Sequence, residues 1–155
     1  MRIIQIIFLL LKFTIIYGQG DNPCSKKIYQ ISDTIPELIS SGQKIVEIIA
    51  SQIKIPDSLV NRKGRIDIQY VINCNGKNVR FKVLTIYDYD KKPMRNDFSF
   101  LGSQIILVLR KDLKWTPARQ GGKNVDFLEI LAVQFGEGYL GVNLRGNWYL
   151  APTKD

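Results

Sequence analysis

The chain has 155 residues, of which 45% are hydrophobic and 23% charged, so its composition is that of a globular protein. Its formal net charge is +8, and it contains no histidine, which excludes catalytic and metal sites built on histidine. The length predicts a single domain.

The first twenty residues have the pattern of a secretory signal peptide. Arg2 precedes a run dominated by Ile, Leu and Phe, and Gly18 and Gly20 are small residues suited to signal-peptidase cleavage. The alternative is a retained membrane helix, but spanning takes ~20 apolar residues, and Lys12 breaks this shorter run. We therefore expect residues 1–20 to be removed, with cleavage after Gly18 or Gly20 left open. The mature protein is expected to be exported, and periplasmic or envelope-associated.

Cleavage after Gly20 would leave 22 minus 2 basic residues against 14 acidic ones, a formal charge of +6. Anionic envelope surfaces and acidic proteins are therefore candidate partners of the mature protein. The alternative is a solvated basic surface that only keeps the protein soluble. Nucleic acid is not expected as a partner, because the protein is expected to leave the cytoplasm.

The two cysteines, Cys24 and Cys74, can pair in an oxidising compartment. Such a disulfide would tie the N-terminal arm, residues 21–35, to the tip of a predicted hairpin. Two thiols without histidine do not make a structural zinc site, which takes four Cys or His ligands. No metal or cofactor is expected.

An amphipathic helix is the first predicted element after the arm, and it begins at about Gln43. Its apolar stripe consists of Ile45, Ile48, Ile49 and Ile53. Ser40 or Ser41 can cap the start of this helix, and Pro56 ends it. A short helical turn is predicted in the segment that follows Pro56.

A β-hairpin is predicted in "GRIDIQYVINCNGKNVRFKVLTIY", because Asn75 and Gly76 are the residues that a two-residue type I′ turn prefers. This turn predicts a core face that pairs Ile72 with Val79, Tyr70 with Phe81, Ile68 with Val83 and Ile66 with Thr85. The other face would pair Gln69 with Lys82, Val71 with Arg80 and Asp67 with Leu84. We therefore expect one face on a core and one largely in water.

A second helix is predicted from about Asp97 to Leu113, although Gly102 weakens the pattern. The residues near its predicted inner face are Leu101, Ile105, Val108, Leu109 and Asp112. Thr116 precedes Pro117 and therefore favours an extended conformation, which ends the helix.

A third strand is predicted from about Val125 to Phe135, after a tight turn at Gly121 and Gly122. Val125, Phe127, Leu131 and Val133 alternate along it, and Glu129 interrupts the apolar series. Trp115 is predicted to be buried where the second helix meets the sheet.

The order and spacing of these elements resemble the C-terminal domain of TonB and the free-standing TonB-like proteins of bacterial envelopes, over about residues 31–135. The matching positions are Gly64 and Arg65, Asn75 to Lys77, Trp115, Pro117 and Ala118, Gly122 and Lys123, and Phe135. The second helix is more apolar than is usual in the family. The sequence also lacks the retained N-terminal helix and Pro-rich spacer of TonB, so energy transduction by this chain alone is not expected.

The resemblance implies an α+β domain at residues 36–135, in which a three-stranded antiparallel sheet packs against two helices. It also implies that the last strand is an exposed edge, to which a partner segment adds as a further strand. The implied partner-binding residues are Val125, Asp126, Phe127, Leu128, Glu129, Ile130, Leu131 and Val133. The expected function is thus a non-enzymatic binding module for an envelope protein or peptide, with an outer-membrane receptor and transport as candidates.

An enzyme and a structural or inhibitory protein are the two other classes of function. An enzyme would draw on Asp88, Asp90 and Asp97, but Lys91 and Lys92 would repel a metal there, so catalysis is not expected.

A structural or inhibitory protein is the alternative, in which the tail, residues 136–155, covers the sheet edge. The tail carries the aromatic residues Tyr139, Trp148 and Tyr149, and whether it forms a strand or an arm is left open. A covered edge would favour this alternative. The oligomeric state and the identity of the partner do not follow from the sequence.

Overall fold

The computed structural model describes residues 22–59, 62–89, 96–136 and 138–153. The predicted signal peptide, residues 1–20, lies outside them. The strands and helices are β1 Ile28–Tyr29, β2 Glu37–Leu38, α2 Gly42–Gln52, β3 Gly64–Ile72, β4 Asn78–Asp88, α3 Asn96–Asp112, β5 Trp115–Thr116, β6 Ala118–Gln120, β7 Lys123–Gly136, β8 Tyr139–Leu144 and β9 Asn147–Pro152. A 3₁₀ turn, Asp57–Leu59, follows α2.

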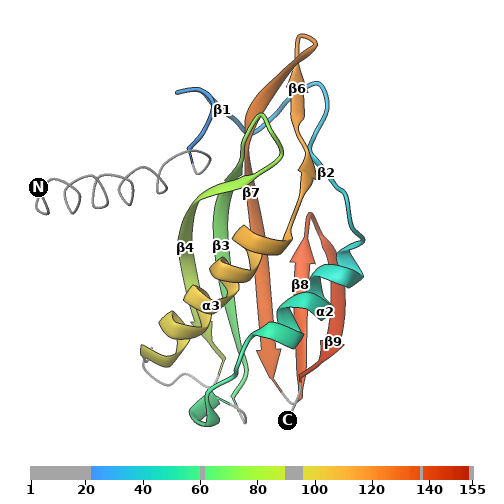
Figure 1. Ribbon diagram of the computed structural model, residues 1–155. Helices are drawn as coiled ribbons and strands as arrows, with labels where there is room; N and C mark the ends of the chain where they lie inside the picture. Colours follow the sequence, from blue (N-terminus) through green and yellow to red (C-terminus); the bar gives the residue numbers. More distant parts are fainter. Residues whose placement is uncertain (1–21, 60–61, 90–95, 137, 154–155) are drawn as a thin grey trace, which may run out of the picture.

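The main sheet has seven strands, so the prediction of a three-stranded sheet is wrong. Five strands follow the order β4-β3-β7-β8-β9, and β1 and β6 also pair with β7 (Figure 1). The extra strands β8 and β9 are an antiparallel hairpin formed by the C-terminal tail. Leu140, Val142 and Leu144 alternate along β8 and are buried against the core, which explains why the tail joins the sheet.

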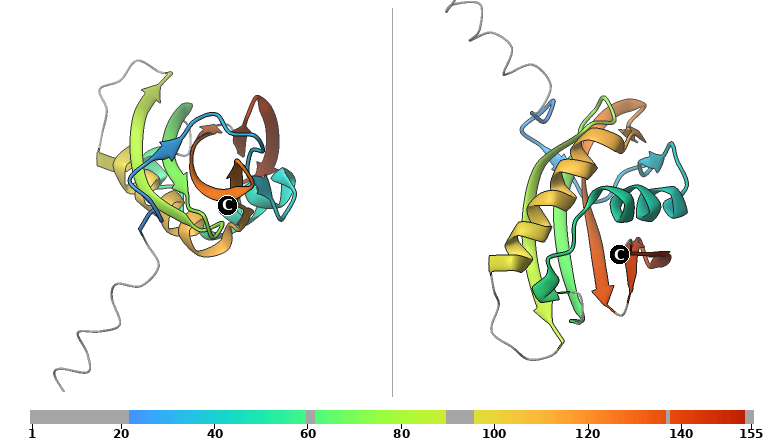
Figure 2. Two further views of the ribbon diagram at one scale, coloured as in Figure 1. Left: turned by 90° about the horizontal axis from the view of Figure 1, so that it is seen from above. Right: turned by 60° about the horizontal axis from the view of Figure 1, so that its bottom comes forward.

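Both helices cover the same face of the sheet, with α3 against β3 and β4 and α2 against β8 and β9 (Figures 1 and 2). The helix α2 is capped as predicted, because Ser41 Oγ accepts a hydrogen bond from the Lys44 N–H, 3.2 Å away. The largest side chains that are fully buried include Tyr70, Phe135, Ile45, Ile49, Ile66, Ile68, Leu101, Ile105 and Leu109. The core therefore lies between the two helices and one face of the sheet.

The predicted register of the β3–β4 hairpin holds only in its middle, where Ile68 pairs with Val83 and Gln69 with Lys82. Nearer the turn, Val71 pairs with Val79, because the loop is one residue longer than predicted. The Asn73 N–H bonds to the Lys77 carbonyl, and Asn73 Oδ1 accepts from the Asn75 and Lys77 N–H groups.

The register between these strands shifts at two irregularities. The first, between Gln69 and Val71, restores the predicted pairing, and the second, between Asp67 and Ile68, shifts the pairing away from it again. Arg80, opposite the first of them, has a φ of 51°. Ile66 consequently pairs with Ile86 rather than with Thr85. Bulges of this kind increase the local twist of an edge strand.

Replacing Gly102 with alanine is expected to raise the free energy of unfolding by about 1 kcal/mol. A Cβ atom there would lie 3.5 Å from Val83 Cγ2 and 3.8 Å from Ile66 Cγ2, which are ordinary contact distances. The new methyl group would therefore fit within α3 while reducing the freedom of the unfolded chain. Urea unfolding measures the change, and a lower midpoint would show that the space is too small.

The same substitution at Gly42 is a matched control with the opposite expected sign. A Cβ at Gly42 would lie 2.2 Å from Tyr149 Cζ, so the Tyr149 ring or the start of α2 would have to shift.

Candidate functional site: the cleft beside β7

The strand β7, which carries the predicted partner-binding residues, lies inside the sheet. Residues 127–135 pair with β3 on one side, and residues 131–136 pair with β8 on the other. The expectation that Val125–Phe135 is an exposed edge is therefore wrong, because β8 pairs with residues 131–135 and β6 and β1 pair with residues 125–127.

The predicted residues divide between the two faces of the sheet. Phe127, Glu129, Leu131 and Val133 are buried on the core side, opposite Ile72, Tyr70, Ile68 and Ile66 of β3. Asp126, Leu128 and Ile130 lie on the other face. Val125 comes before the β3 pairing and pairs with Ala118 of β6.

A short stretch of β7, Leu128–Ile130, has no strand beside it opposite β3 among the described residues. On that side, pairing with β1 ends at Phe127 and pairing with β8 begins at Leu131. A cleft of about 590 Å³ opens here, which we call the β7 cleft. Its lining includes Gln30, Ile35, Phe127, Leu128, Glu129, Ile130, Asn143 and Arg145.

The direction of the backbone groups follows from one hydrogen bond. The Ile130 N–H donates to the Glu129 side chain, 3.2 Å away, and so points away from β3. In an antiparallel strand every second residue directs its N–H and C=O to the same side. Leu128 therefore directs its main-chain donor and acceptor toward the β7 cleft.

A partly buried ion pair forms one wall of the β7 cleft. Glu129 Oε2 accepts a hydrogen bond from Arg145 Nε, 2.7 Å away, and a second one from Arg145 Nη2. Arg145 Nη1 also donates to the Pro36 carbonyl, 2.7 Å away, and its guanidinium lies over the Trp115 ring. This arginine thus links the β8–β9 turn to the segment just before β2 and to the core.

Tyr70 and Trp115 are buried next to this ion pair, with their ring centroids 6.4 Å apart. Burial raises the pKa of Tyr70 well above its ordinary value of 10.0, and the nearby Glu129 carboxylate raises it further. The phenol therefore stays protonated at neutral pH. In the sequence, the interruption of the apolar series at Glu129 indicates this cluster, whereas Arg145 is not among the residues predicted from the sequence to belong to it.

The predicted disulfide between Cys24 and Cys74 is confirmed, with Cα atoms 5.9 Å apart. It fastens the arm beside the hairpin tip. Asp126 is buried beneath it, where one carboxylate oxygen accepts from the Ser25 N–H at 2.7 Å and the other from the Cys74 N–H at 2.8 Å. These three side chains are grouped closely, but both sulfur atoms are used in the disulfide.

Residues of the predicted structural motif meet at the hairpin tip. Gly76 has a φ of 75°, and a Cβ there would lie 2.0 Å from the Trp115 carbonyl oxygen, so only glycine fits. The Trp115 N–H donates to the Gly76 carbonyl, 3.2 Å away. Asn75 is exposed beside Cys24, and Gly64 begins β3. Gly122 takes a φ of 76° in the β6–β7 turn. Pro117 immediately precedes β6.

The structure describes no cluster of Asp88, Asp90 and Asp97, the acidic residues on which an enzyme would draw. Asp88 is buried in an ion pair with Arg62. Asp90, Lys91 and Lys92 lie outside the described residues, and the structure does not describe the side chain of Asp97.

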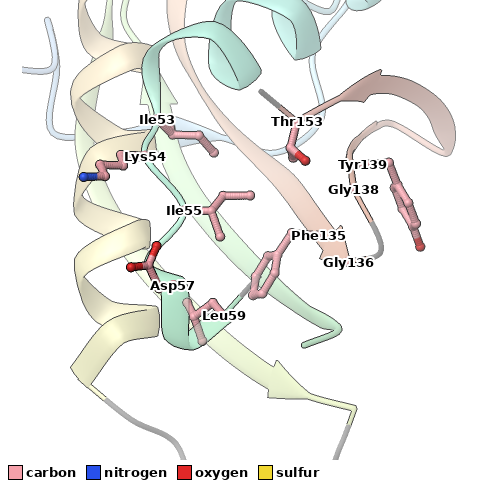
Figure 3. A pocket seen from close by; sticks show the side chains of 10 residues that line it. All are labelled: Ile53, Lys54, Ile55, Asp57, Leu59, Phe135, Gly136, Gly138, Tyr139 and Thr153. Atoms are coloured by element: carbon pink, nitrogen blue, oxygen red, sulfur yellow. The ribbon is translucent and has the colours of Figure 1, made fainter. Parts of the chain in front are cut away.

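A different pocket, of about 350 Å³, lies at the far end of the sheet, between the segment after α2 and the β7–β8 turn (Figure 3). The side chains of Ile55, Leu59 and Phe135 point toward one another in it, whereas Lys54 points away. Leu59 and Phe135 are almost completely buried and belong to the core. The arrangement brings no set of charged groups together for chemistry.

Within the described ranges, no helix has the length and apolar character needed to cross a membrane. Compared with models of protein families, the sequence matches none of them. Compared with curated proteins, it matches none either.

Proposed function

We propose that this protein is an exported, non-enzymatic binding module that takes up an extended peptide segment of an envelope protein in the β7 cleft. The observation that carries the proposal is the unpaired side of Leu128–Ile130, which lies between two places where other strands already pair with β7. A peptide lying there would add one short strand and bond to the main chain of Leu128.

The chemistry of the cleft suits an uncharged, partly apolar peptide. Ile130 and Ile35 are 46% and 51% exposed beside it, while the charge of Glu129 is balanced by Arg145. The confirmed disulfide is typical of proteins that fold in an oxidising compartment, which supports export. Membership of the TonB C-terminal family remains a prediction that rests on the sequence motifs.

A second candidate function is favoured by the C-terminal hairpin. Because β8 and β9 cover β7 from Leu131 onward, the chain fits the alternative of a structural or inhibitory protein that closes its own edge. The two candidates differ in one respect. Only the binding module needs the β7 cleft to accept a peptide.

Selection of random displayed peptides on the immobilised mature protein tests the binding module. We expect selected peptides to slow hydrogen exchange at the Leu128 amide. Leu128→Pro removes this outward donor and is expected to abolish peptide binding while circular dichroism stays unchanged. Gln30→Trp, which narrows the cleft from an exposed position, provides a second variant if Leu128→Pro fails to fold.

Trp148→Pro is the matched control, because it changes an outward residue on the edge strand β9. The Leu150 carbonyl on this strand accepts from Gln43 Nε2, 3.0 Å away, and so points outward, as Trp148 two residues earlier also does. This control should bind peptide normally. Loss of binding in Trp148→Pro alone would place strand addition on β9, and failure to select any peptide would favour the structural protein.

A further inference from the structure

A second cleft, of about 400 Å³, lies where the end of α3 meets the tip of the β3–β4 hairpin. Its lining includes Lys77, Arg110, Lys111 and Lys114, and we call it the basic cleft. Its walls are held by hydrogen bonds: Asn78 Nδ2 donates to the carbonyls of Leu109, 2.8 Å away, and Leu113, 3.1 Å away. The cationic side chains therefore project from a fixed frame.

Among the described residues, no carboxylate lines the basic cleft or forms an ion pair with its cations. All four cations are exposed, and no acidic residue is among the lining residues. Ion pairs in the described part of the chain join Arg62 to Asp88, Arg65 to Asp67 and Arg145 to Glu129, all outside this cleft. Asp112, on the last turn of α3, instead accepts a hydrogen bond from Gln52 Nε2, 2.8 Å away.

A purely structural role explains only part of this charge. Cations near the end of a helix interact favourably with its macrodipole, which is equivalent to roughly half a negative charge there. Arg110 also lies over the Phe81 ring, with its Cζ 5.5 Å from the ring centroid. Four positive charges exceed what one helix end can balance, and they repel one another when no anion is present.

We propose that the basic cleft binds a ligand that carries phosphate groups. A phosphate group concentrates about −1.5 to −2 charges in a compact anion, which suits a cleft lined by four cations better than a single carboxylate does. The volume lies within the ~300–1,000 Å³ range of small-molecule sites. The exposed Ile39 adds apolar surface for the rest of the ligand, and the buried Leu113 and Trp115 lie beneath the cleft.

A phospholipid headgroup and a soluble phosphate compound share this chemistry. Two probes separate these sources: inorganic pyrophosphate, titrated by calorimetry, and vesicles of phosphatidic acid, whose headgroup is a phosphate monoester, in phosphatidylcholine, measured by co-sedimentation against pure phosphatidylcholine. The site does not depend on the peptide proposed for the β7 cleft.

The variant that tests the site combines Lys77→Gln, Lys111→Gln and Lys114→Gln. Its matched control combines Lys26→Gln, Lys44→Gln and Lys123→Gln, which removes the same charge from exposed positions elsewhere. We expect saturable binding of at least one probe, weakened about tenfold or more in the cleft variant and about twofold or less in the control.

Each result decides for or against the proposal. Binding of pyrophosphate without vesicle binding would identify a soluble phosphate, and binding of the anionic vesicles would identify a lipid headgroup. Saturable binding of neither probe, or equal weakening in both variants, would overturn the site. A cleft variant that binds normally but melts at a lower temperature than the control would show that the cations only stabilise α3.

Discussion

Trp115→Ala is expected to lower the free energy of unfolding by about 3 to 5 kcal/mol. The indole is only 3% exposed and packs against Tyr70 and the Arg145 guanidinium. Its removal would leave a cavity between the main sheet and the strand β5. The pairing of Trp115 with Leu38 of β2 holds β5 in place, so the cavity would not simply close. Equilibrium unfolding in urea, followed by circular dichroism, measures the loss.

Trp148→Ala is the matched control for this substitution, because Trp148 is 46% exposed on β9. Its replacement should cost less than about 1 kcal/mol. Equal unfolding midpoints for Trp115→Ala and the parent protein would contradict the burial of Trp115. A loss in Trp148→Ala as large as that in Trp115→Ala would show that something covers β9 in solution.

Glu129→Ala is expected to cost about 2 to 4 kcal/mol, somewhat less than a fully buried ion pair. Glu129 is nearly inaccessible, whereas the Arg145 side chain is 27% exposed, so water screens part of the interaction. Without the carboxylate, the guanidinium would lie over Trp115 with only the Pro36 carbonyl to bond. Chemical denaturation measures the effect.

A double-mutant cycle separates the loss of the ion pair from the cost of leaving one charge unpaired. Glu129→Leu combined with Arg145→Met should be more stable than Glu129→Leu alone, because the double variant leaves no charge unpaired. Additive effects of the two single changes would show that Glu129 and Arg145 do not interact in solution.

The elements with a strong period could be predicted from the sequence. The apolar stripe of α2, the inward residues of α3 and the alternation in β7 all depend on spacing within one segment. The hairpin register was harder to predict, because the Asn73 side chain shapes a longer loop and Arg80 takes a positive φ. Neither feature changes the alternation of apolar residues in the sequence, so the pattern from which the register was predicted does not reveal them.

The strands β8 and β9 escaped prediction because glycine dilutes their pattern. Gly141 lies in the middle of β8, where a Cβ would come within 3.0 Å of the Leu150 side chain. The turn at Arg145 and Gly146 is also hard to recognise, since arginine rarely takes the positive φ of 52° seen here. The resemblance to a family whose sheet has three strands then led to the wrong prediction that β7 is an exposed edge strand.

The candidate site could be predicted only in part. The sequence indicated strand addition along β7, but the length of the open stretch depends on where β1 and β8 stop pairing with it. These limits are set by contacts between segments about a hundred residues apart in the case of β1. No local pattern encodes them. The basic cleft likewise depends on how the end of α3 meets the hairpin tip.

The position of the C-terminal hairpin has a consequence for how the chain folds. The strand β3, which pairs with one side of β7, precedes it in the sequence, whereas β8 and β9 follow it and are synthesised later. A nascent chain that ends near Gly136 can therefore form the helices and β3, β4 and β7 while the edge from Leu131 onward still lacks a neighbour. During this interval a second nascent chain can donate its own hairpin, so strand exchange between copies competes with completion of the monomer.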